Sequence, residues 1–239
     1  ETTRSIHNII QFECSQLKEN ISPIDIINSF ENIKVFKSNF HHNFEMIDIN
    51  ENLKTEELYF KCDEYNTTKY DFTNIKKLKH LKKLELINFK HLQNFDFIEN
   101  MVSLTYLNLY STNFDETLCF NKLTNLAILD ISYTNVSKLE NLILPNLKEL
   151  NISGTNIKSF IKIPMFTNLE VLVINSTDIF DQYNSKQIFW ETNVYLNNLK
   201  SLSIESVNFD YKLLDFMPNL NQFYWSNCPL EYYKINSLY

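Results

Sequence analysis

The chain has 239 residues, a formal net charge of -7 and 44% apolar residues. That length and apolar content suffice for one sizeable core or one repeat array, and the acidic balance argues against a nucleic-acid-binding protein. The single glycine, Gly154, excludes the phosphate-binding loops that need several glycines, and no apolar stretch of about 18 residues predicts a membrane span. Asn, Ile, Lys, Tyr and Phe abound while Ala and Arg are scarce, which indicates an AT-rich genome.

The first 29 residues fall outside the regular pattern of the rest of the chain. Thr2 or Thr3 can N-cap a helix that ends before Ser22 and Pro23. The apolar side of this helix would consist of Ile6, Ile9, Ile10 and Leu17. Because repeat arrays need atypical ends to cover their core, residues 1–29 are predicted to form a helical N-terminal cap.

A motif of 11 residues recurs in the centre of the chain. It reads LxxLxLxxTx(I/V/F) and occupies residues 104–114, 126–136, 147–157 and 169–179. Units that begin at Leu81, Leu199 and Leu220 continue it, and units at Phe30 and Thr55 fit it more loosely. Four blocks in register are a far stronger signal than a single motif, so the sequence indicates a repeat architecture.

The alternation of apolar residues within each block predicts a short strand. Leu107 and Leu109 would point inward and Asn108 outward, because successive side chains of a strand lie on opposite faces. One unit cannot bury its own apolar face, so units stack and share a continuous core. The leucines at the fourth position of the four blocks should therefore be almost fully buried on adjacent parallel strands; they are Leu107, Leu129, Leu150 and Leu172.

The motif resembles the leucine-rich-repeat family from Leu81 to Leu230, and in looser form from Phe30. The resemblance implies an α/β fold, a right-handed solenoid or horseshoe of eight or nine units over residues 30–239. Its parallel sheet would be concave, and its convex side would consist of 3-10 turns, short helices or extended segments. The ninth position, where the family usually has Asn, holds Thr112, Thr134, Thr155 and Thr177 and later Val207. A Thr hydroxyl can still hydrogen-bond the backbone of the bend, whereas Val207 cannot.

One interval between units is too long. Leu169 and Leu199 are 30 residues apart, about eight more than a regular unit, and the excess lies in residues 180–195. An insertion of this kind often forms a binding loop on one face. The alternative is a longer helical return segment in which Trp190 packs against the core.

No pattern in the sequence nominates a catalytic or metal site. The five histidines form no H-E-x-x-H motif, and no Cys–His spacing fits zinc, so we expect no enzyme, no cofactor and no metal. The four cysteines are far apart, as in an intracellular protein with reduced thiols. The basic stretch at residues 76–83 is either a phosphate-binding or localisation patch or an ordinary soluble strand with lysines between core leucines.

Outward-facing positions of the predicted strands carry a broken apolar stripe. Candidate partner-binding residues on this stripe are Tyr106, Tyr110, Ile128, Tyr133, Val171 and Val173, and Trp190 joins them from the insertion. Gly154 is expected to leave a gap that a partner's side chain can enter. Apolar and Tyr-rich patches mark partner sites, although scattered exposure and codon bias are rival explanations.

The sequence therefore favours a protein-protein interaction module that binds a protein partner through its concave sheet. One alternative is a regulatory subunit that docks a phosphatase or another enzyme. A second is a secreted or surface adhesion protein of a parasite. The resemblance carries over no catalytic residues, and no nucleic acid, cofactor or membrane span is expected.

Overall fold

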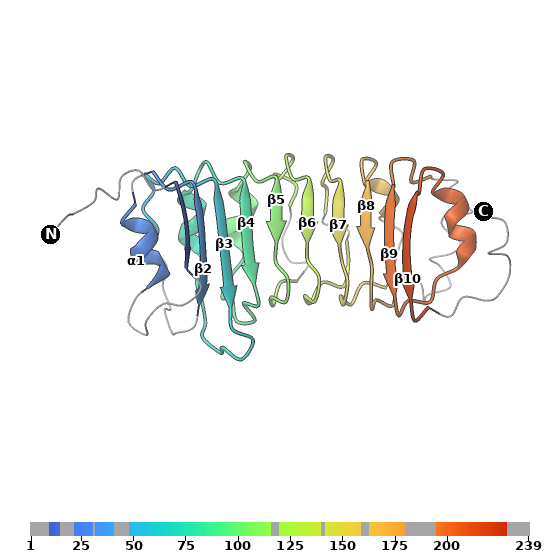
Figure 1. Cartoon of the computed structure of the whole chain (residues 1–239), viewed down its shortest axis with the longest axis horizontal. Helices are drawn as coiled ribbons and strands as arrows, with labels where there is room; N and C mark the ends of the chain where they lie inside the picture. The colour runs from blue at the N-terminus through green and yellow to red at the C-terminus, as the bar shows by residue number, and fades with distance from the viewer. Residues whose placement is uncertain are drawn as a thin grey trace.

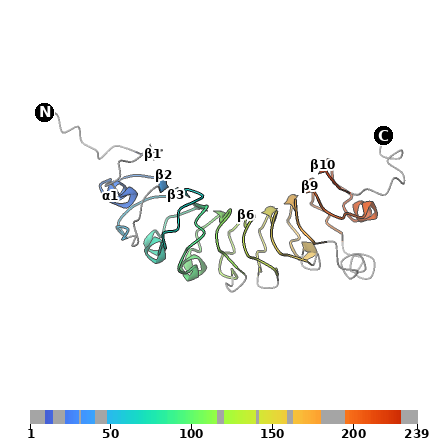
Figure 2. The ribbon, with the colours of Figure 1, turned by 90° about the horizontal axis from the view of Figure 1, so that it is seen from below.

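The computed structural model describes residues 10–14, 22–30, 32–40, 48–115, 120–139, 142–158, 163–179 and 195–228. These residues form one parallel sheet of ten strands, β1 to β10, in which each strand pairs with the next one along the chain (Figure 1). Figure 2 shows that the sheet lines the inner, concave side of an arc and that the return segments form its outer side. The predicted solenoid with a parallel concave sheet is confirmed, with ten strands where eight or nine units were expected.

The strands differ in length along the array. They are β1 Gln11–Cys14, β2 Val35–Phe40, β3 Glu57–Cys62, β4 Lys83–Ile87, β5 Tyr106–Asn108, β6 Ile128–Asp130, β7 Glu149–Asn151, β8 Val171–Val173, β9 Ser201–Glu205 and β10 Gln222–Ser226. The described convex side holds one α-helix and four 3-10 turns. They are α1 Pro23–Asn28, η2 Thr73–Lys77, η3 Asp96–Asn100, η4 Ile163–Met165 and η5 Tyr211–Phe216.

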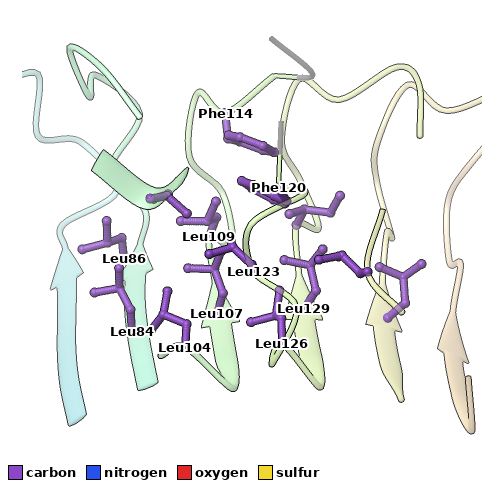
Figure 3. Packing of buried hydrophobic residues seen from close by; sticks show 14 of the residues in the cluster. Leu84, Leu86, Leu104, Leu107, Leu109, Phe114, Phe120, Leu123, Leu126 and Leu129 are labelled. Atoms are coloured by element: carbon purple, nitrogen blue, oxygen red, sulfur yellow. The ribbon is translucent and has the colours of Figure 1, made fainter. Parts of the chain in front are cut away.

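A column of leucines runs through the core along the length of the sheet. Neighbouring strands pair so that the fourth position of each unit lies opposite the fourth position of the next. The four leucines predicted to be buried there are at most 1% exposed; they are Leu107, Leu129, Leu150 and Leu172. Figure 3 shows Leu84, Leu107 and Leu129 in this column, with Phe114 and Phe120 packed above them. This prediction is confirmed, because stacking is the way in which each unit buries its apolar face.

The N-terminal segment differs from the helix expected between Thr2 or Thr3 and Ser22. Gln11–Cys14 is strand β1, which pairs in parallel with β2, so the prediction of a helix through these residues is wrong. Phe12 explains the difference, because its ring stacks on Phe36 with centroids 5.7 Å apart, and Phe36 lies directly opposite it on β2. The sheet therefore begins before residue 30, and Ile10, expected on an apolar helix face, is 59% exposed.

A helix does form in this segment, but it begins where the sequence analysis expected one to end. The Ser22 hydroxyl oxygen accepts a hydrogen bond from the Ile24 N–H at 3.1 Å, and Pro23 occupies the first turn, so α1 starts with a favourable cap. The helix buries Pro23, Ile24 and Ile27 against the end of the core.

The turn that follows the strands has the same backbone conformation in seven consecutive units. A residue with positive φ, between 51° and 64°, stands at the eighth position of each; the seven are Asn88, Ser111, Tyr133, Gly154, Ser176, Ser206 and Asn227. In the first six of these units, the backbone N–H of this residue donates to a carbonyl of the next unit, as from Tyr133 to Ser153 at 2.8 Å. These bonds continue the hydrogen-bonding ladder past the ends of the strands.

Threonine hydroxyls close the same turn from inside. Each donates to the carbonyl three residues earlier, at distances from 2.6 to 3.0 Å; the donors are Thr112, Thr134, Thr155 and Thr177. All four are buried, so the bond satisfies a polar group that would otherwise be costly to bury. The sequence analysis predicted that a Thr hydroxyl would bond the backbone of the bend at the position where the family usually has Asn. Val207, which stands at the ninth position of a later unit, is buried without a hydroxyl.

Candidate interaction surface

The concave face is built from two columns of outward residues. The first column crosses the sheet through Lys83, Tyr106, Ile128, Glu149 and Val171, which lie directly opposite one another on β4 to β8. Tyr106 and Ile128, two residues of the predicted stripe, are thus adjacent. The exposed Glu149 separates them from Val171, so the apolar stripe is interrupted at β7.

The second column is polar over the central strands. It runs through Asn108, Asp130 and Asn151 to Val173. Each of the three polar side chains accepts, through Oδ1, a hydrogen bond from the backbone N–H two residues later, at 2.9 to 3.1 Å. Asn151 also donates from Nδ2 to Asp130 at 3.0 Å. These three side chains therefore stabilise the turns that follow their strands. Val173 lies on the same face of β8 as Val171 and forms an apolar patch with it.

Tyr106 is half-buried on the concave face and is fixed at its polar end. Its hydroxyl donates to Glu85 Oε1 on β4 at 2.6 Å. Burial raises the pKa of Tyr106 above its ordinary value of 10.0, and the bond to Glu85 raises it further, so the phenol stays neutral. The side chain therefore forms a rigid, uncharged part of the surface.

Tyr59 has a similar arrangement that the sequence analysis did not single out. Its hydroxyl donates to Glu57 at 2.6 Å, and the Lys37 ammonium lies 5.0 Å from its ring centroid. Tyr59 belongs to a looser unit of the repeat, where the motif gives a weak register. The one signal in the sequence was its place at the fifth position of that unit, opposite Lys37 and Glu85.

Tyr110 and Tyr133 contact each other in the turns that follow β5 and β6. Their ring centroids are 5.4 Å apart with an interplanar angle of 64°, an edge-to-face arrangement. Tyr110 is 38% exposed and Tyr133 is 52% exposed. The structure therefore brings these two candidates together, but at the edge where the strands end and not at the middle of the sheet.

Gly154 supports this pair and does not leave the gap that the sequence analysis expected. A Cβ atom added to Gly154 would lie 2.7 Å from Cδ1 and Cε1 of Tyr133, so the tyrosine ring already fills the space. Gly154 also has φ +62°, which strains any residue with a Cβ. The prediction of a gap was wrong because the residue at the same position of the preceding unit is large.

Two clusters of charge stand at the positions just before the strands. Glu56 accepts hydrogen bonds from Lys34 at 3.0 Å and from Lys82 at 2.7 Å. These bonds lower the pKa of Glu56 from its ordinary 4.5 to about 2, with the bond to Lys82 as the largest cause. Glu170 is held in the same way by Lys148 and Lys200, and its pKa is also lowered. The Lys and Glu residues at the second position of units Thr55, Leu81, Leu147, Leu169 and Leu199 were the signal in the sequence. Lys34 takes the same position because its unit begins at Ile33, since Phe36 pairs with Leu58; the predicted start at Phe30 was wrong by three residues.

The described residues were compared with the requirements of a metal site, a reactive thiol and a membrane span. Among them, no three His, Cys, Asp or Glu side chains lie close enough to hold a metal ion. Burial raises the pKa of the Cys62 thiol to about 11, which keeps it protonated. No helix in the described ranges is long and apolar enough to cross a bilayer. Trp190 and most of the 180–195 insertion lie outside the described residues.

Comparisons with known proteins identify the fold. No protein-family model and no curated protein matches the sequence. Among solved structures, InlP of Listeria monocytogenes is similar with a TM-score of 0.67 and 14% identity over 92% of this chain and 61% of its own. The internalin InlF of Listeria monocytogenes has a TM-score of 0.61 and 19% identity over 84% of this chain and 63% of its own. A leucine-rich-repeat protein of Leptospira interrogans has a TM-score of 0.50 and 20% identity over 84% of this chain and 60% of its own. This chain thus spans less than two thirds of each of them.

Proposed function

Because the chain has the leucine-rich-repeat fold, we propose that it is a protein-protein interaction module. Its partner docks on the concave sheet around Tyr106 and Ile128 and on the edge formed by Tyr110 and Tyr133. The observation that supports this site best is the exposed, edge-to-face pair of Tyr110 and Tyr133, held in place by Gly154. Val171 and Val173 extend the proposed contact across β8.

The physical argument rests on what tyrosine offers to a partner. A tyrosine side chain contributes large contact area with few rotatable bonds, and it keeps a polar tip for hydrogen bonding. Because the two rings pack on each other, less side-chain entropy is lost on binding.

The backbone of Tyr133 adds a second argument. Tyr133 has φ 55°, a conformation that in the other six units is left to Asn, Ser or Gly. A left-handed conformation costs a residue with a Cβ roughly 1–2 kcal/mol, and sites of strain concentrate where function requires them. Partner binding gives a reason for a bulky residue at this place.

The test begins with affinity capture from the native organism, identified by mass spectrometry. The dissociation constant of the purified partner is then measured for the wild-type chain and for Tyr110→Ser/Tyr133→Ser. We expect the double variant to weaken binding by about 2 kcal/mol, roughly thirtyfold, with little loss of melting temperature. Tyr65→Ser is the matched control, because Tyr65 is 93% exposed and lies away from the site. Equal affinity for wild type and double variant would refute the proposed site.

The identity of the captured protein separates the finer alternatives. A phosphatase or another enzyme would favour a regulatory subunit, whereas a receptor on another cell would favour a secreted or surface adhesion protein. We infer an intracellular location from the dispersed cysteines. Intact mass with thiol counting tests this inference, because attached glycans or disulfides would contradict it.

A further inference from the structure

A hollow with an unusual concentration of positive charge opens beside the concave sheet. It has a volume of about 370 Å³ and lies at the edge where β2, β3 and β4 begin. Its charged and titratable lining residues are Lys34, Lys54, Glu56, Lys79, His80 and Lys82. Three of these belong to the basic stretch at residues 76–83 that the sequence analysis left with two interpretations.

The charges of this hollow do not balance among the described residues that line it. Four lysines face one carboxylate, and Glu56 is already held by Lys34 and Lys82. Lys79 donates to the Lys76 carbonyl at 3.1 Å and forms no ion pair with a carboxylate of the described residues. Within the described part of the chain, Lys54 has no carboxylate partner. The chain as a whole carries a net charge of -7, so this local excess of positive charge is a specific feature of the hollow.

A second charge cluster on the same edge shows how few lysines are required to link two units through one glutamate. Lys148, Glu170 and Lys200 repeat the arrangement of two lysines on one glutamate at the same edge of the sheet. That cluster links neighbouring units without equivalents of Lys54 and Lys79. The extra lysines of the hollow are thus not needed to hold a glutamate between two units.

We propose that the hollow binds a phosphate monoester on a phosphorylated residue of the protein partner. A phosphate monoester carries a charge of about -1.5 to -2 and three acceptor oxygens, which suits several converging ammonium groups. The volume admits a phosphorylated side chain. The hollow adjoins the concave sheet, since Lys34, Glu56 and Lys82 each come directly before a strand. The inference rests on the proposed function and names one chemical feature of the partner.

A membrane surface fits the same lysines less well. An anionic bilayer would also cover the neighbouring outward carboxylates Glu57 and Glu85, which do not line the hollow and which a single bound phosphate need not contact. The concave shape of the sheet also keeps a flat bilayer away from it (Figure 2). A single phosphate on a protein segment avoids both difficulties.

The experiment uses N-acetyl-phosphoserine amide as the probe and follows the His80 ring and the backbone amides of residues 79–82 by NMR. We expect saturable shifts that weaken as salt is raised. Lys54→Glu and Lys54→Glu/Lys79→Glu should raise the dissociation constant of the probe about tenfold or more. Lys200→Glu is the matched control from the second cluster and should leave it unchanged. Melting temperatures of all variants verify that they are folded.

Several results would overturn the proposal. They are the absence of shifts, charge-reversed variants that bind as well as wild type, and equal affinity for N-acetyl-glutamate amide, which would indicate an acidic peptide. Equal affinity for inorganic phosphate would indicate a free-phosphate site, and binding to phosphatidylserine vesicles without a response to the probe would indicate a membrane. Failure of the proposed function is distinguishable from failure of this proposal. Tyr110→Ser/Tyr133→Ser should weaken the partner about thirtyfold but bind the probe as wild type does.

Discussion

The N-terminal and central parts of the solenoid both bury their apolar faces by stacking units, but they differ in strand length and in the residues of the core. Strands β2 and β3 have six residues each, whereas β5 to β8 have three each (Figure 1). The N-terminal core is aromatic: Phe40 lies 4.8 Å from Phe60, 5.6 Å from Tyr70 and 5.5 Å from Phe89 between ring centroids. The central core is mainly aliphatic, with leucine or isoleucine at the inward positions of each strand.

The difference in strand length follows from the side-chain oxygens that take backbone N–H groups just past the strands. At the fifth position of β5 to β7, Asn108, Asp130 and Asn151 accept a hydrogen bond from the backbone N–H two residues later, which removes that N–H from the ladder between strands. In β8, where Val173 holds this position, the equivalent N–H of Asn175 donates to the Ser153 hydroxyl of the preceding unit at 3.1 Å. Among the described residues, Glu85 at the same position of β4 accepts no such bond from the backbone of its own turn and instead accepts from the Tyr106 hydroxyl, and β4 extends to five residues. In β5 to β8, a strand therefore ends where a side-chain oxygen takes the backbone N–H that would continue the ladder.

The largest loss of stability should come from truncating a buried side chain in either core. Phe40→Ala removes the centre of the aromatic cluster and should lower the free energy of unfolding by about 3–5 kcal/mol. Leu150→Ala in the central column should cost roughly 2–5 kcal/mol, since the leucine is 1% exposed. Urea denaturation measures both. A loss below about 1 kcal/mol for either residue would contradict its place in the core.

Gly154→Ala should have the next largest effect, about 1–3 kcal/mol, because the new Cβ meets the Tyr133 ring and a positive φ. A double-mutant cycle with Tyr133→Ala separates the two causes. If the ring contact matters, Gly154→Ala costs less when Tyr133 is already Ala. Additive losses in urea denaturation would show that the backbone conformation alone is responsible.

Asn108→Ala tests the account of strand length. The variant loses the acceptor for the Tyr110 N–H and should lower the free energy of unfolding by about 0.5–1.5 kcal/mol. Asn108→Asp keeps an acceptor oxygen, as Asp130 does in the next unit, and serves as the control. Equal stability of the Ala and Asp variants would refute a role for this bond.

The smallest expected effect is the change in stability with pH that Glu56 causes. Glu56 has a pKa of about 2 in the folded chain, below its ordinary 4.5, so its contribution to stability is present above pH 4.5 and lost as the pH falls toward 2. Lys82→Ala removes the largest cause and should raise this pKa, measured by ¹³C NMR of the carboxyl group. Lys200→Ala is the control, because it acts on Glu170. No change in the Glu56 pKa with Lys82→Ala would show that the pair is not formed in solution.

Much of the fold could be predicted because the repeat motif fixes which residues face the core. Leu107 and Leu129 follow from periodicity alone, and the Thr134 bond follows from its position in the motif. The N-terminal strand could not be predicted, because residues 11–14 lack the leucines of the motif. Their place depends on contacts with a strand more than twenty residues away, as Phe12 and Phe36 show.

The candidate site was predicted in part, because sequence places residues on a face but does not say what fills the space between them. Tyr106 and Ile128 are adjacent as expected, since register alone decides this. The contact of Tyr133 with Gly154 depends on side-chain size in neighbouring turns. The hollow at Lys54 combines residues from three units, two of which fit the motif loosely.

Hydrogen exchange of the chain, alone and bound to its captured partner, tests the central claim most directly. Binding to the proposed surface should slow exchange in the peptides that cover residues 106–112 and 128–134, where β5, β6 and their turns lie. The convex 3-10 turns at Asp96–Asn100 and Tyr211–Phe216 should exchange at unchanged rates. Protection confined to those convex turns would contradict the account, because the partner would then dock on the opposite side of the solenoid.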